Sequence, residues 1–169
     1  MTAVRLLSRR EHTCEELRRK LLDKGYAPEF VEPVVEKLAG KRLVSDDRYV
    51  ASFVHAHTRR GQGPARIRAE LRQRGIDASR VEEEFERAGV DWVALAVQVR
   101  RRKFGAAAPK SLTERAKQSR FLQYRGFEAD QIRAALGVEM SVEMGETSST
   151  PSSDPGPDLH VVDEGLDPD

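Results

Sequence analysis

The sequence has a single cysteine, no long hydrophobic run and no segment with the alternation typical of a strand. One cysteine, Cys14, cannot form an intramolecular disulfide, which excludes a small disulfide-stabilised fold. No window approaches the roughly 18 consecutive apolar residues of a membrane-spanning helix, and the start lacks the apolar run of a signal peptide. We therefore expect a cytoplasmic protein with no membrane segment.

Signatures of catalysis and of nucleotide binding are also missing. The chain contains neither a Gly-x4-Gly-Lys-Ser/Thr phosphate loop nor a Gly-x-Gly-x-x-Gly sequence after a strand. His55 and His57 are two residues apart, so on a helix their side chains diverge by about 200° and do not form a metal site. His12 lies near Cys14, but two further ligands are lacking. We expect a protein that is not an enzyme and that needs no metal and no cofactor.

Positive charge is absent from the end of the chain. Residues 138–169 contain nine carboxylates and no Lys or Arg, whereas residues 1–137 carry 29 basic and 19 acidic side chains. A body with this excess attracts polyanions or acidic protein surfaces, and its binding should weaken with salt. Residues 138–169 are rich in Ser, Pro and Gly and too poor in apolar side chains to offset the entropy of ordering. We expect this acidic tail to be disordered and to compete with ligands for the basic body.

One pattern, Leu-x3-Gly-apolar-x4-apolar-x3-apolar, occurs three times in the body. The copies are Leu21, Gly25, Tyr26, Val31 and Val35; Leu71, Gly75, Ile76, Val81 and Phe85; and Leu122, Gly126, Phe127, Ile132 and Leu136. The glycines are 50 and 51 residues apart, which predicts three structural repeats. In each copy the leucine ends a helix and the glycine caps it in a left-handed conformation. The next apolar residue then folds back on the core, and the last two face inward from a second helix.

A further helix precedes this pair in the second and third repeats. It covers about residues 46–60 with Ser45 or Asp46 as its cap, and about residues 92–103 with Asp91 as its cap. The same spacing places part of the first repeat's opening helix before the first residue, so we expect that helix to be truncated. Other helix-start signals are Thr13 with Glu16, Pro28, Pro64, and Ser79 with Glu82.

These signals predict an all-α protein of three tandem three-helix repeats without a sheet. The composition, with 38% hydrophobic and 34% charged residues, is typical of an elongated stack of small units with a large surface for its volume. The predicted divisions are residues 1–44, 45–89 and 90–137 for the repeats and 138–169 for the disordered acidic tail.

Clustered cations are the strongest binding signal. Arg68 and Arg72 are one helical turn apart, and such a like-charge pair costs a few tenths of a kcal/mol, so we expect a ligand there. Cations at helix carboxyl ends explain part of the rest. The candidate binding residues are Arg59, Arg60, Arg66, Arg68, Arg72, Arg74, Arg100, Arg101, Arg102, Lys103, Lys117, Arg120 and Arg125. Phe104 and Tyr124 lie among these cations, where they would stack on bases or pack in the core.

Several ordered motifs resemble the RecX family of bacterial regulators of the RecA recombinase. They are RREHT (9–13), ELRRKL (16–21), DDRY (46–49), GPARIRAEL (63–71), DW (91–92) and RFLQYRGF (120–127). The resemblance covers roughly residues 4–137. Family members usually carry more residues before the first motif, and the acidic tail has no counterpart in the family pattern.

The resemblance implies three three-helix repeats in an elongated, curved molecule. It also implies a monomer that binds the RecA filament on single-stranded DNA and restrains its growth, ATP hydrolysis, strand exchange and co-protease activity. Direct contact with DNA would be weak. The alternative hypothesis is a direct nucleic-acid-binding protein whose repeats act like helix-turn-helix readers. A third alternative is an enzyme of unrecognised type.

Overall fold

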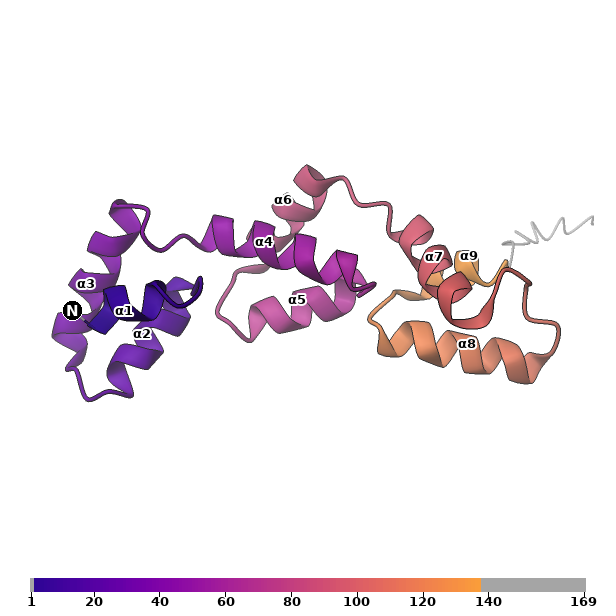
Figure 1. Cartoon of the computed structure of the whole chain (residues 1–169), viewed down its shortest axis with the longest axis horizontal. Coiled ribbons are helices and arrows are strands. Elements are labelled where there is room, and N and C mark those ends of the chain that lie inside the picture. Colours follow the sequence, from indigo (N-terminus) through magenta and orange to yellow (C-terminus); the bar gives the residue numbers. More distant parts are fainter. Residues whose placement is uncertain (1, 138–169) are drawn as a thin grey trace, which may run out of the picture. The chain divides into compact units, whose positions relative to one another are not determined.

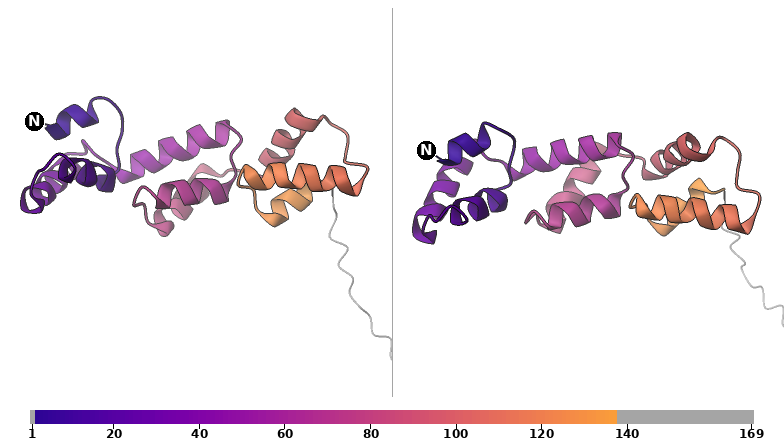
Figure 2. Two further views of the ribbon diagram at one scale, coloured as in Figure 1. Left: turned by 90° about the horizontal axis from the view of Figure 1, so that it is seen from below. Right: turned by 60° about the horizontal axis from the view of Figure 1, so that its bottom comes forward.

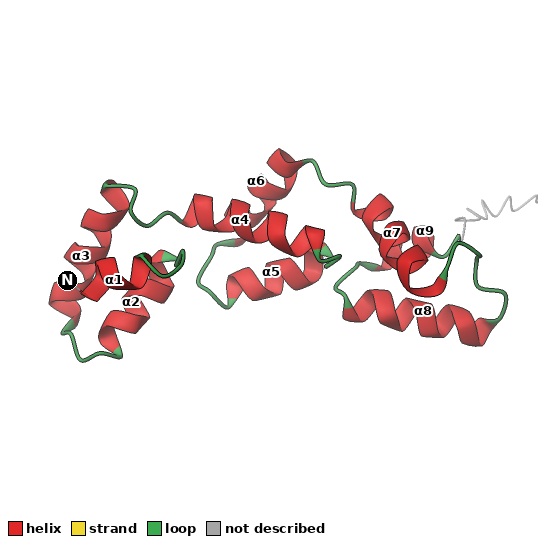
Figure 3. Cartoon of the chain, viewed as in Figure 1, coloured by secondary structure: helices red, strands yellow, loops and turns green. Residues whose placement is uncertain are grey.

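The computed structural model describes residues 2–137, which form nine helices and no strand (Figures 1 and 3). The helices are α1 (Thr2–Leu7), α2 (Cys14–Leu22), α3 (Pro28–Gly40), α4 (Asp46–Arg59), α5 (Pro64–Arg72), α6 (Ala78–Ala88), α7 (Trp92–Phe104), α8 (Leu112–Tyr124) and α9 (Ala129–Ala135). The predicted all-α fold is confirmed over these residues. Within them, no helix is both long enough and apolar enough to span a membrane. The predicted tail, residues 138–169, lies outside the described residues.

The helices form three bundles of three, each with its own core. In the first bundle α2 packs against α1 and α3, in the second the three helices pack on one another, and in the third α7 packs against both α8 and α9. Each core consists mainly of aliphatic side chains, with Phe85 in the second and Phe127 in the third, and many of them lie four residues apart on one helix face. The most completely buried leucines, Leu17, Leu71 and Leu122, lie on the middle helix of their bundle. The predicted three three-helix repeats are therefore confirmed.

The same turn ends the middle helix of every repeat. The glycine of this turn has a positive φ of 83° at Gly25, 76° at Gly75 and 89° at Gly126. The N–H of the next residue donates to the carbonyl of the repeat's leucine five positions back, over 3.3, 3.2 and 3.1 Å. This bond closes the helix end, and a residue without Cβ adopts the required left-handed conformation without strain.

The residue after the glycine folds into the core in two repeats only. Ile76 and Phe127 are buried, as predicted, whereas Tyr26 is 45% exposed. The prediction was wrong for Tyr26 because α1 has six residues, against 14 in α4 and 13 in α7, and covers less of its bundle. The Tyr26 hydroxyl instead forms a hydrogen bond with the Thr2 hydroxyl, 2.7 Å away.

Most predicted helix starts are found in the structure. Ser45 caps α4 and Asp91 caps α7, each side chain accepting a backbone N–H three residues later. Pro28 and Pro64 occupy first-turn positions of α3 and α5. The cap predicted at Ser79 was wrong. Helix α6 begins at Ala78 after Asp77, and Glu82 binds Arg68 in place of a backbone N–H.

Neighbouring repeats join through the ends of their middle helices (Figure 2). At the first junction, the hydroxyl of Thr13, the cap of α2, donates to the Arg74 carbonyl just after α5 over 2.8 Å. At the second junction, the N–H of Gly63, the cap of α5, donates to the Arg125 carbonyl just after α8, also over 2.8 Å. The amino end of one helix therefore satisfies carbonyl groups at the carboxyl end of the next, and the helix dipoles meet favourably.

Candidate binding surface

The first junction neutralises its own positive charge. Glu16, whose side chain is only 9% exposed, accepts a hydrogen bond from Arg10 over 3.0 Å and lies 3.7 Å from Arg74. Its backbone N–H binds Thr13, but its carboxylate turns to the two arginines, so the capping box predicted from the sequence is only half formed. Glu11 nearby pairs with Arg48 over 2.7 Å. Little charge is therefore left for an external ligand.

The second junction has no carboxylates at the positions equivalent to Glu11 and Glu16. At the positions equivalent to Glu11 and Glu16, fifty residues later, the chain has Gly61 and Arg66. The cations are retained, because Arg60 corresponds to Arg10 and Arg125 corresponds to Arg74. Arg60 and Arg125 therefore lack the carboxylate partner that Arg10 and Arg74 have in Glu16.

The cations of the second junction surround a hollow of about 130 Å³. Its walls include Arg60 from the end of α4, Arg102 and Lys103 from the end of α7, and Arg125 from the end of α8. No carboxylate among residues 2–137 forms an ion pair with any of these four side chains. We call this hollow and its four cations the basic hollow.

Three helix carboxyl ends explain why the cations gather here. The partial negative charge at the ends of α4, α7 and α8 favours nearby cations, and Arg125 donates to the Arg60 carbonyl over 3.0 Å. Arg125 also lies 5.3 Å from the Phe121 ring centre. These contacts position the Arg125 guanidinium. The partial negative charges of the helix ends are too small to neutralise four full positive charges. The arrangement therefore attracts an anionic group.

An exposed aromatic side chain lies next to the second junction. Tyr124, at the end of α8, is 79% exposed, and the Arg66 guanidinium lies 5.9 Å from its ring centre. Phe104, the other aromatic residue among the cations, packs edge-on against Phe121 inside the third repeat. Of the two residues predicted to stack on bases or pack in the core, Phe104 therefore packs and Tyr124 faces solvent.

Other candidate cations stabilise the fold. Arg68 binds Glu82 over 2.6 Å and also pairs with Glu128 of the third repeat, so two carboxylates offset its positive charge and account for the like-charge pair with Arg72 without an external ligand. The hydrogen bond from Arg68 to Glu82 raises the pKa of Arg68. Arg74 pairs with Glu16 and packs over a phenylalanine ring.

Arg100 is buried and does not belong to the candidate binding surface. It is only 4% exposed, and its guanidinium donates to the carbonyls of Ala106 and Ala107 and to the Gln118 side chain. It thus holds the loop between α7 and α8 from the inside. The remaining predicted cations are exposed on their helices but do not line the basic hollow: Arg59, Arg72, Arg101, Lys117 and Arg120.

The Arg68 ion pairs should make stability depend on pH. The Arg68 hydrogen bond lowers the pKa of Glu82 below its ordinary value of 4.5. A lowered carboxyl pKa stabilises the fold above the ordinary value, and this contribution disappears as the pH falls through the lowered value. When the pH is lowered from about 6 to about 3, the free energy of unfolding measured in urea should fall less for Arg68→Met than for the wild type. An equal loss in the two proteins would contradict this role.

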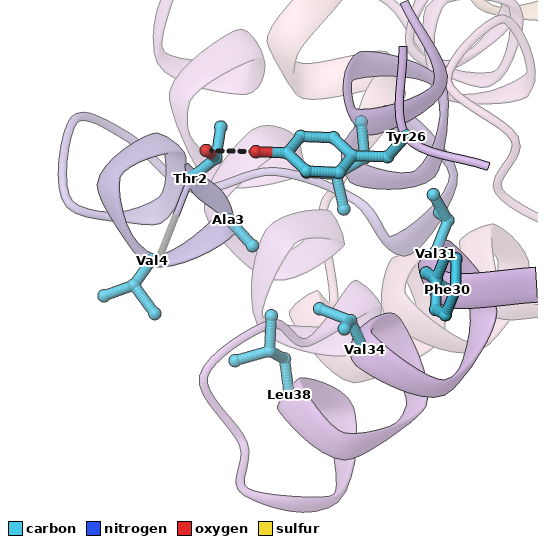
Figure 4. Close-up of a pocket in the computed structure, with 9 residues that line it drawn as sticks. Thr2, Ala3, Val4, Tyr26, Phe30, Val31, Val34 and Leu38 are labelled. Atoms are coloured by element: carbon cyan, nitrogen blue, oxygen red, sulfur yellow. Dashed lines mark hydrogen bonds between the residues drawn. The ribbon is translucent and has the colours of Figure 1, made fainter. Parts of the chain in front are cut away.

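The first repeat has an apolar hollow of about 390 Å³ between α1 and α3 (Figure 4). Phe30 and Val34 border it and are 68% and 41% exposed. They form a second apolar stripe on α3, one position before the buried stripe of Val31 and Val35. The signal was visible in the sequence as two adjacent apolar pairs, but the repeat pattern selected only the inner pair.

Models of the RecX family match all three bundles. The first, second and third three-helix domains of RecX match residues 2–38, 45–83 and 90–136. The chain belongs to the RecX family. Regulatory protein RecX of Halorhodospira halophila is 50% identical over 136 residues, which cover 80% of this chain and 84% of that protein. Regulatory protein RecX of Pseudomonas syringae pv. tomato is 46% identical over 135 residues, with coverage of 80% and 87%.

Solved RecX structures share the fold. The crystal structure of RecX from Lactobacillus salivarius has a TM-score of 0.70 at 22% identity and covers 80% of this chain and 90% of its own. A second crystal structure of regulatory protein RecX has a TM-score of 0.66 at 26% identity, with coverage of 82% and 71%. The resemblance to RecX drawn from the motifs is thereby confirmed, and the relatives are named as regulatory proteins.

Proposed function

We propose that this protein regulates the RecA recombinase without catalysis, by binding the RecA filament on single-stranded DNA as a monomer. The match of all three RecX domains carries this proposal. Bound to the filament in the cytoplasm, the protein restrains filament growth, ATP hydrolysis, strand exchange and co-protease activity. Such inhibition requires contact with the filament and needs no active-site chemistry, cofactor or metal.

The basic hollow supports binding to a polyanionic assembly. A filament presents nucleic-acid phosphates and acidic side chains, and uncompensated cations accelerate and strengthen association with such a surface. Arg102 and Lys103 are exposed at the rim of the hollow and make no ion pair with residues 2–137. Their charge is therefore available to the partner.

The test is RecA-catalysed, single-stranded-DNA-dependent ATP hydrolysis with this protein titrated in at moderate salt. We expect suppression at protein concentrations well below that of RecA, and a weaker effect for the double variant Arg102→Glu with Lys103→Glu. Lys37→Glu, an exposed cation of α3, serves as the control for a reversed charge. Unchanged hydrolysis together with tight binding to duplex DNA alone would reject regulation of RecA.

That outcome would favour the second candidate, a direct nucleic-acid-binding protein. The exposed Tyr124 beside Arg66 supports some contact with nucleic acid. Sequence-specific reading of a duplex is less well supported. Glutamine side chains can read base edges, but Gln118 is buried and accepts a hydrogen bond from Arg100, whereas Gln73 is exposed.

A further inference from the structure

We infer that the second junction is a binding site for single-stranded nucleic acid, with a backbone phosphate in the basic hollow and a base stacked on Tyr124. This inference deepens the proposed function, on which it rests for its biological setting. The chain would bind nucleic acid directly, in the absence of RecA, and would do so at the second junction but not at the first.

The charge and size of the basic hollow suit a phosphate group. Four cations from three different helix ends converge on about 130 Å³, a space that holds a small anion and not a folded element. Arg125 is anchored through the Arg60 carbonyl at one side, so its guanidinium is already positioned before a ligand arrives. A positioned guanidinium loses less entropy on binding and matches phosphate geometry.

The first junction is the internal control for this assignment. Its Arg10 and Arg74 correspond to Arg60 and Arg125 of the basic hollow, but Glu16 lies between Arg10 and Arg74. A carboxylate of the chain thus occupies the position that an external anion would take. At the second junction this position is held by Arg66, which binds Glu70 on its own helix over 3.0 Å.

The aromatic side chain favours nucleic acid over an acidic protein surface. At the position of Tyr124 the first two repeats have Asp23 and Gln73, so only the third repeat has an aromatic residue at this position. Tyr124 is 79% exposed, and its only described aromatic or cation contact is with Arg66. A solvent-facing ring beside cations provides a platform on which bases of any sequence stack.

A single strand fits these features better than a duplex. Stacking on Tyr124 requires a base whose face is free, whereas the bases of a duplex are stacked on one another. Cations contact backbone phosphates and the Tyr124 ring contacts the face of a base, and neither contact reads the edge of a base. We therefore expect binding with little sequence preference.

The experiment measures fluorescence anisotropy of a labelled 15-nucleotide thymidine oligomer with the full chain and no RecA. Arg66→Glu recreates the arrangement of Glu16 at the first junction, so we expect at least tenfold weaker binding at low salt. Tyr124→Gln, which copies Gln73, should weaken binding about fivefold or more. Lys37→Glu should bind as the wild type does, and circular dichroism checks that each variant is folded.

One further ligand and one double variant test the stacking contact and the phosphate contact separately. An abasic oligomer of equal length should bind more weakly than the thymidine oligomer and be indifferent to Tyr124→Gln. The double variant Arg102→Gln with Lys103→Gln should lower the slope of log affinity against log salt by about 0.7 for each phosphate that the variant no longer binds. Because Arg102 and Lys103 are exposed, we expect this double variant to fold, so it tests the phosphate contact even if Arg66→Glu is unstable.

Several results would overturn the inference. Wild-type affinity in Arg66→Glu and Tyr124→Gln would remove the site from the second junction, and tighter binding of a 15-base-pair duplex would exclude a single-strand site. Competition by poly-glutamate at lower concentrations than by the oligomer would assign the surface to an acidic protein. A different outcome separates this inference from the proposed function. If the wild-type protein binds the oligomer but does not suppress ATP hydrolysis by RecA, regulation of RecA is rejected and the nucleic-acid site is kept.

Discussion

Gly63→Ala is expected to lower the free energy of unfolding by about 1–3 kcal/mol and to open the second junction. A Cβ at position 63 would lie 2.3 Å from the carbonyl oxygen of Gly126 and 2.4 Å from the amide nitrogen of Phe127. Both of these atoms belong to the backbone, so no side-chain rotation relieves the clash. The φ of Gly63 is −83°, which alanine adopts freely, so the cost comes from the close approach alone.

Separating the two backbones removes hydrogen bonds as well. The N–H groups of Gly63 and Ala65 donate to the carbonyls of Arg125 and Gly126 over 2.8 and 3.0 Å. Gly126 packs closely against the same segment, because a Cβ at position 126 would lie 2.7 Å from the backbone nitrogen of Arg66. We therefore expect the second and third repeats to move apart at this junction.

Urea unfolding and hydrogen exchange of peptides covering residues 60–66 and 122–128 measure this effect. The matched control is Gly40→Ala, because a Cβ at Gly40 meets nothing within 4 Å and Gly40 ends α3 without a positive φ. That control should match the wild type or exceed it slightly. An unchanged midpoint and unchanged exchange in Gly63→Ala would show that the backbones are not tightly packed.

Arg68→Glu is expected to destabilise the body by about 1–2 kcal/mol, whereas Arg72→Glu should have almost no effect on stability. Reversal at position 68 removes two ion pairs and places a third carboxylate beside Glu82 and Glu128. The three side chains are between a third and a half exposed, so water screens the repulsion and limits its size. Arg72 is exposed and forms no ion pair within residues 2–137.

Chemical unfolding of both variants at neutral pH, in low and in high salt, measures the difference. Salt should narrow the gap between Arg68→Glu and the wild type, because it screens exposed charges. Equal stability of the two variants would show that the Arg68 ion pairs contribute nothing. The sequence alone predicted a shared ligand-binding role for Arg68 and Arg72, whereas the Glu82 and Glu128 ion pairs separate their expected effects.

Local features explain why so much of the fold was predictable from the sequence. The three glycines end helices because the left-handed turn after Leu21, Leu71 and Leu122 is encoded within five residues. The caps at Ser45 and Asp91 depend only on the next three residues. Burial followed the spacing of four in all three bundles, and the prediction failed only for the residue after the glycine at Tyr26, in the bundle whose first helix is short.

The candidate site was less predictable because its residues are distant in sequence. The predicted cations included Arg60, Arg102, Lys103 and Arg125, but nothing in the sequence showed that these four meet and that Arg100 points inward. Aligning the repeats on their glycines would have exposed one signal, the replacement of Glu16 by Arg66 at the equivalent position.

By itself, the sequence determined the three helical repeats, their turns and caps, the positive body and the RecX motifs, since each depends on neighbouring residues or on composition. Only the tertiary structure decided which cations are compensated. Ion pairs such as Arg68 with Glu128 join residues sixty positions apart, and the second junction brings three helix ends to one hollow. Charge compensation depends on distances of a few ångströms between side chains, and these are set by how the repeats pack.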